Sequence, residues 1–144
     1  MPAKSFRCER RPINAHALRL RPGDDPKAAL NALAEAHAWE AAGVLTCVGS
    51  LRTAVLRFAN QEEAITLTGH FEIVSLTGVF SRHGGHYHIA IADGTGRTYG
   101  AHLMDGSEIY TTAEIVLAVL DDERFLRSFD PATGYEELDI QPVL

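Results

Sequence analysis

The chain has 144 residues, 46% of them hydrophobic and 22% charged, which suits a single domain with a buried core. No apolar run approaches the ~20 residues that a membrane-spanning helix needs. Two cysteines are too few for a disulfide framework, and the charged N-terminus lacks the apolar segment of a signal peptide, so we expect a cytoplasmic protein.

Positive charge is concentrated at the N-terminus. Residues 1–21 hold six basic residues and one acidic residue, a net charge of +5, whereas residues 22–144 hold seven basic and 18 acidic residues, a net charge of −11. We expect residues 1–13 to form a flexible basic arm and residues 14–144 to form one domain. Because an acidic domain repels phosphate, affinity for nucleic acid would depend on the arm or on a local basic patch. The alternative is a solvated tail without a specific partner.

The first predicted elements are a strand and a helix. Residues 15–21 alternate in polarity, which is typical of a strand. Asp25 suits a helix cap, Pro26 suits the first helical position, and Gly43 suits the residue after the end, so the sequence predicts a helix over residues 27–42.

The rest of the chain is predicted to be mostly strand. Short connections containing Gly, Asn or Asp favour antiparallel neighbours. Residues 112–120 have a composition compatible with a helix, but their β-branched side chains favour a strand. Residues 121–128 are expected to form a short helix or turn, and residues 130–134 a loop. The predicted strands after the helix are 44–49, 51–59, 64–69, 71–82, 86–92, 97–104 and 109–120.

These elements predict an α+β fold with a large, mostly antiparallel sheet and a few flanking helices. Residues 73–80 are apolar on both faces of their predicted strand. A second subunit is therefore expected to cover one face of the sheet, which predicts a homo-oligomer.

Three histidines surround a predicted turn at residues 94–96. His86 and His88 are two apart and share one face of a strand. If residues 94–96 form the loop, paired residue numbers sum to 190, and His102 lies opposite His88. A loop of even length would turn His102 to the other face. Three neutral imidazoles suit zinc or a similar divalent metal and leave a coordination position open for a small molecule. The alternative is two solvated histidines and one buried histidine.

Four segments follow one another in the order residues 69–78 (GHFEIVSLTG), 85–89 (GHYHI), 100–106 (GAHLMDG) and 113–117 (AEIVL). In this order they resemble the PPC family, which is named for plants and prokaryotes. The resemblance extends over about residues 18–138. It implies an α+β domain that assembles as a homotrimer and a metal held by His86, His88 and His102.

The resemblance also implies a DNA-binding or regulatory role. Plant members carry an AT-hook, Arg-Gly-Arg-Pro, before the domain and act as nuclear DNA-binding regulators. Here the nearest segment, residues 9–12 (ERRP), lacks the glycine, and His70 replaces the plant arginine before Phe-Glu-Ile. These departures and the acidic domain count against DNA binding.

A zinc-dependent enzyme or small-molecule sensor acting on a carbonyl or carboxylate compound is the alternative function. The PPC fold is similar to that of acetolactate decarboxylase, a zinc enzyme with three histidine ligands. Zinc with an open position can polarise a carbonyl, and a nearby carboxylate could move the proton. Glu72 is the first candidate for that carboxylate and Glu114 the second. The alternative for both is a structural or solvated side chain.

Overall fold

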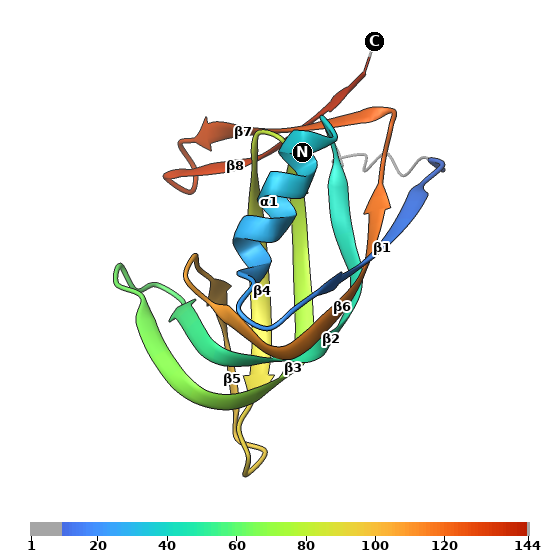
Figure 1. Ribbon diagram of the computed structural model, residues 1–144. Coiled ribbons are helices and arrows are strands. Elements are labelled where there is room, and N and C mark those ends of the chain that lie inside the picture. The colour runs from blue at the N-terminus through green and yellow to red at the C-terminus, as the bar shows by residue number, and fades with distance from the viewer. Residues whose placement is uncertain (1–9, 144) are drawn as a thin grey trace.

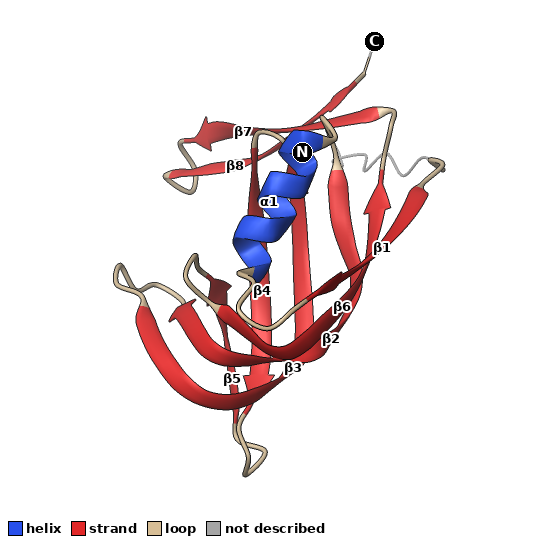
Figure 2. Cartoon of the chain, in the orientation of Figure 1, coloured by secondary structure: helices blue, strands red, loops and turns tan. Residues whose placement is uncertain are grey.

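A six-stranded sheet carries one helix, and a separate two-stranded hairpin lies at one end of it (Figures 1 and 2). The computed structural model describes residues 10–143. The expected fold class is confirmed, with a single helix in this part of the chain in place of a few. In chain order the elements are β1 (Asn14–Leu20), α1 (Pro26–Ala36), β2 (Ala42–Arg57), β3 (Ile65–Ser81), β4 (Gly84–Ala92), β5 (Thr98–Leu103), β6 (Glu108–Val119), β7 (Glu123–Asp130) and β8 (Tyr135–Pro142).

The strand order of the large sheet is β1-β6-β2-β3-β4-β5, and neighbouring strands are antiparallel. Strand β5 also pairs with the end of β2, where Leu56 lies opposite Leu103 and Arg57 opposite His102. Strands β2 to β5 therefore close into a ring of paired strands. The sheet curves strongly, and α1 lies across its concave side (Figure 1).

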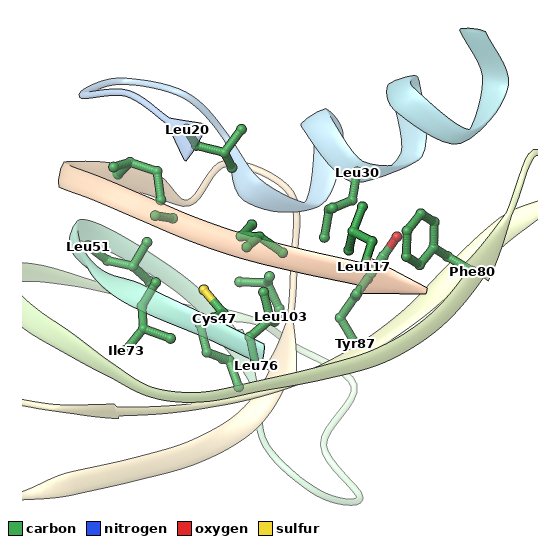
Figure 3. Packing of buried hydrophobic residues seen from close by; sticks show 14 of the residues in the cluster. Leu20, Leu30, Cys47, Leu51, Ile73, Leu76, Phe80, Tyr87, Leu103 and Leu117 are labelled. Atoms are coloured by element: carbon green, nitrogen blue, oxygen red, sulfur yellow. The ribbon is translucent and has the colours of Figure 1, made fainter. Parts of the chain in front are cut away.

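The core lies between α1 and the concave face of the sheet. Leu30 and Ala34 on the helix are fully buried, because the apolar residues of a helix at this spacing share one face. The Tyr87 hydroxyl donates a hydrogen bond to Asn31 Oδ1 at 2.7 Å, which links β4 to the helix. Figure 3 shows side chains from α1 and from the strands of the large sheet meeting in this core, among them Leu20, Leu30, Leu51, Ile73, Leu76, Tyr87, Leu103 and Leu117.

Helix α1 begins as predicted and ends earlier. The Asp25 carboxylate accepts hydrogen bonds from the backbone N–H groups of Lys27 and Ala28, and Pro26 is the first helical residue. The predicted end at residue 42 is wrong. Ala38 takes a left-handed conformation with φ of 53°, and such a residue ends a helix because it cannot continue the hydrogen-bond pattern.

Two pairs of predicted strands are single long strands. The predicted breaks between residues 49 and 51 and between residues 69 and 71 lie inside β2 and β3. Gly49 is required by close packing in the sheet, because a Cβ there would lie 2.2 Å from the carbonyl oxygen of Thr112 on β6. The strand predicted over residues 109–120 is confirmed as β6.

The predicted helix or turn at residues 121–128 is wrong, because most of this segment belongs to β7. All eight residues of β7 pair with β8, and the expected loop at residues 130–134 is the turn that joins them. The backbone N–H of Phe125 also donates to the carbonyl oxygen of Glu40 at 2.8 Å. Pairing with β8 and this non-local hydrogen bond give the backbone N–H and C=O groups of the segment their partners, which stabilises its extended conformation.

Part of the predicted basic arm lies outside the described residues. Residues 1–9, including Cys8, are not described. Arg11 is described, and its side chain lies 3.2 Å from the Glu123 carboxylate at the start of β7. Cys47 is buried in the core. No helix within residues 10–143 is long and apolar enough to cross a membrane.

Candidate metal centre

The β4–β5 hairpin has the register that the sequence predicts. His88 lies opposite His102, and Ala92 lies opposite Thr98. Tyr87 and Ile89 are buried, whereas His86 and His88 are exposed on the other face of β4. The alternation of side chains along a strand therefore turns the histidines away from the core.

The three-residue turn is held by Asp93. Its carboxylate accepts hydrogen bonds from the backbone N–H groups of Thr95 and Arg97, at 2.9 and 3.0 Å, and from the Thr95 hydroxyl at 2.6 Å. The hydrogen bonds of Thr95 and Arg97 lower the pKa of the Asp93 carboxyl. Gly96 has φ of 82°, which a glycine adopts without strain. Because the turn has an odd number of residues, the side chain of His102 lies on the same face of the sheet as those of His86 and His88.

The three histidines converge on one point. One ring nitrogen of each lies within 4.8 Å of the corresponding nitrogen of the other two. His86 Nε2 and His102 Nδ1 are 3.4 Å apart. Nitrogen ligands at 2.0–2.1 Å from a tetrahedral zinc ion would be roughly 3.4 Å from each other. The donor set and its spacing therefore fit a divalent metal.

The environment favours neutral imidazoles. Burial lowers the pKa of His86, and the positive charges of His88, Arg127 and Arg57 lower it further, while Glu137 opposes this effect. Burial and Arg57 likewise lower the pKa of His102. Imidazole binds metal in its neutral form, so these shifts favour the form that can act as a ligand near neutral pH.

A cleft of about 860 Å³ opens beside His86 and His102. Its lining comes from the end of β2 and the following loop, including Arg57, and from the β7–β8 hairpin, including Arg127 and Glu137. His88 lies away from this cleft and lines two smaller hollows of about 350 and 390 Å³. The face of the three histidines is thus open to small molecules.

The two carboxylates considered as proton carriers lie elsewhere. Glu72 is exposed and lies opposite Ala92, which is four residues beyond His88 on β4. Four residues of strand span roughly 13 Å. Glu114 is on β6, opposite Val48 and Arg19, and β2 and β3 separate it from β4. Neither belongs to the cluster of potential ligands in the described residues.

The sequence analysis missed the charged residues around the histidines. Arg57 reaches the site because β2 pairs with β5, a closure with no local sequence signal. Arg127 and Glu137 belong to the β7–β8 hairpin. The sequence does contain a signal for that hairpin, since the turn-forming residues at 130–134 separate two segments that are each long enough to be a strand.

The other histidines of residues 10–143 make separate contacts. His83 Nε2 lies 3.1 Å from the Glu40 carboxylate, and His70 stacks on Tyr110 with ring centroids 4.4 Å apart. His16 and His37 both contact the Trp39 ring. None of these four joins the metal-ligand cluster.

The fold and the site define a small antiparallel domain with a three-histidine donor set on an open face. The profile of the Plants and Prokaryotes Conserved (PCC) domain matches residues 8–121. The chain therefore belongs to this family, which is the PPC family that its motifs resemble.

Solved structures share this fold. A protein from Salmonella cholerae-suis described as hypothetical is 37% identical with a TM-score of 0.92, over 94% of this chain and 99% of that one. The metal-containing protein AF0104 from Archaeoglobus fulgidus is 26% identical with a TM-score of 0.77, over 93% of this chain and 99% of that one. A "putative dna binding protein" from Bacteroides thetaiotaomicron is 24% identical with a TM-score of 0.75, over 88% and 91% of the two chains. At this identity the last likeness shows the fold alone.

Curated relatives include a much longer protein. The chain is 48% identical over 131 residues to the bifunctional protein GlmU of two Synechococcus strains. The match covers 91% of this chain and 21% of each GlmU, so the chain spans about a fifth of the length of these relatives. None of these comparisons shows the expected likeness to acetolactate decarboxylase.

Proposed function

We propose that this PCC-domain protein binds a divalent metal ion, zinc, through His86, His88 and His102 and uses the open coordination position to bind a small molecule. The convergence of three ring nitrogens within 4.8 Å carries this proposal. The metal-containing relative from Archaeoglobus fulgidus supports it. Structural zinc sites are usually closed by four protein ligands, whereas a site with three ligands leaves room for water or substrate.

A bound zinc ion would polarise a carbonyl or carboxylate oxygen of the small molecule. The three histidines would orient the metal, and the hollows around them would admit the ligand. This arrangement supports a small-molecule sensor or a metal-dependent enzyme acting on a carbonyl or carboxylate compound. The position of Glu72 favours the sensor, because proton transfer requires a base within hydrogen-bond reach of the bound molecule.

Metal analysis of the chain purified without an affinity tag tests this proposal. We expect close to one equivalent of zinc in the wild type and a loss of most of it in His88→Ala. His70→Ala is the matched control, since His70 is also an exposed strand histidine but stacks on Tyr110 outside the cluster. Full metal retention by His88→Ala would refute the ligand assignment, and a wild type that stays metal-free in excess zinc would refute the site.

A DNA-binding role is the second candidate, and the net charge of +5 in residues 1–21 favours it. Residues 22–144 carry a net charge of −11, so residues 1–21 would supply the contacts to phosphate. The test is binding to A·T-rich duplex at near-physiological salt, with and without residues 1–13. Salt-dependent binding that disappears with the deletion would support the role, and no binding by the full chain would contradict it.

We also propose that the chain assembles as a homotrimer, as the family resemblance implies. Leu45 and Val48 on β2 and Val74 on β3 are more than half exposed. A group of exposed aliphatic side chains on a sheet is typical of a surface that another subunit covers.

A further inference from the structure

The cleft beside the histidines is lined by two arginines that form no ion pair within residues 10–143. Arg57 and Arg127 are both half-buried, and both line the cleft. Arg57 donates to the carbonyl oxygen of Gln61 at 2.9 Å, which fixes its side chain at the cleft. The planar guanidinium group of an arginine matches the geometry of a carboxylate.

The same cleft carries acidic and aromatic groups. Glu136 and Glu137 come from β8, together with the exposed ring of Tyr135. Ionised carboxylates only accept hydrogen bonds, so a ligand that contacts them must supply donors such as hydroxyl groups. A molecule with one carboxylate end and several hydroxyl groups would satisfy both the arginines and the glutamates.

A bound metal ion would decide the sign of the charge in the cleft. Two arginines against the three glutamates Glu62, Glu136 and Glu137 leave its lining with a net charge of −1. A divalent ion on His86 and His102 would change this to +1. The lining therefore favours an anion only after the metal has bound.

We propose that this cleft binds a small hydroxycarboxylate anion, with its carboxylate between the metal position and the two arginines and its hydroxyl groups toward Glu136 and Glu137. This inference rests on the proposed metal site. The volume of about 860 Å³ accommodates a ligand of the size of a sugar acid.

Calorimetric titration of the zinc-loaded chain tests the proposal with three probes of equal chain length. D-gluconate has the carboxylate and the hydroxyl groups, D-glucitol lacks the carboxylate, and hexanoate lacks the hydroxyl groups. We expect saturable binding of gluconate at least tenfold tighter than that of either analogue, and no gluconate binding after removal of the metal. Inorganic phosphate is the fourth probe, and tighter binding of phosphate than of gluconate would overturn the assignment to a carboxylate.

Variants connect the binding to the two arginines. Arg57→Gln and Arg127→Gln should each weaken gluconate binding about tenfold, because a charge-assisted hydrogen bond is lost. Arg97→Gln, in the exposed β4–β5 turn beside Tyr99, should bind as the wild type does. In the cobalt-loaded chain, gluconate should change the visible absorption spectrum, since it enters the coordination sphere.

The outcomes separate the two proposals. A chain that takes up no metal overturns the proposed function and this inference together. A chain that holds metal and binds gluconate no better than glucitol overturns the inference alone. Arginine variants that retain both metal and full gluconate affinity would show that the ligand lies elsewhere.

Discussion

The positions of the histidines depend on the residue between two of them. Tyr87 is 1% exposed and points into the core, and its burial raises the pKa of its hydroxyl well above the usual range. Its ring lies over Gly78 on β3, where a Cβ would be 2.4 Å from the ring and 2.9 Å from the carbonyl oxygen of His86. A residue without a side chain is thus needed for β4 to lie at its observed position.

Gly78→Ala is expected to destabilise the protein by about 1–3 kcal/mol, the usual cost of overpacking a core. The measurement is the free energy of unfolding in urea. Gly100→Ala is the control, because nothing lies within 4 Å of a Cβ at that strand position. Equal stability of Gly78→Ala and Gly100→Ala would contradict the proposed role of Gly78.

The lowered pKa values of His86 and His102 predict a pH dependence of the metal-free chain. Both lie below the ordinary value of 6.5. The unfolded chain then takes up protons before the folded one as the pH falls. The stability that these two histidines contribute is fully present above about pH 6.5, and it is lost as the pH falls through their pKa values in the folded chain.

Urea unfolding at pH 7.5 and pH 5.5 checks this effect. The loss of stability on acidification should be smaller in the double variant His86→Gln/His102→Gln than in the metal-free wild type. An identical loss in both proteins would show that other groups cause the pH dependence.

At the scale of elements, the β7–β8 hairpin reaches the site because Glu40 anchors it. The Glu40 carboxylate lies 3.1 Å from Arg124 on β7, 3.1 Å from His83 and 3.8 Å from Arg82. Burial raises the pKa of Glu40, but these three partners outweigh that effect and lower it. The Ser81 hydroxyl adds a hydrogen bond of 2.7 Å to the carbonyl oxygen of Phe125. This attachment holds Arg127 at the wall of the cleft.

Glu40→Gln should loosen the hairpin without affecting the histidines. We expect faster amide hydrogen exchange in residues 123–142, a loss of stability of about 1 kcal/mol, and unchanged metal content. Glu63→Gln is the matched control, since Glu63 is exposed and forms no ion pair within residues 10–143. Unchanged exchange in residues 123–142 would show that strand pairing alone holds the hairpin.

At the scale of the whole molecule, the exposed aliphatic face adjoins the histidines. Gly49 on β2 lies opposite Ile73 on β3, and Val48 and Val74 are their neighbours in the chain. Thr77 on β3 lies opposite His88. Val48 and Val74 are 63% and 59% exposed. In the proposed homotrimer the metal site would therefore lie close to the border between subunits.

Light scattering coupled to gel filtration should give a mass of about three times 15.7 kDa for the wild type. Val48→Asp should shift the protein toward the monomer, because a carboxylate would be buried in the apolar interface without a partner. Ala132→Glu, a change of equal charge in the exposed β7–β8 turn, should leave the trimer intact. A monomeric wild type would contradict the assembly.

The sequence by itself determined the antiparallel fold class, the cap of α1 and the gathering of His86, His88 and His102. These features depend on local rules, namely the alternation of side chains along a strand and the parity of one short turn. Only the tertiary structure decided that β2 continues unbroken past Gly49, that residues 123–130 are extended, and that Arg57 and Arg127 lie beside the histidines. These features arise where β2 meets β5 and β6 and where Glu40 holds the β7–β8 hairpin, and such non-local contacts override local propensity.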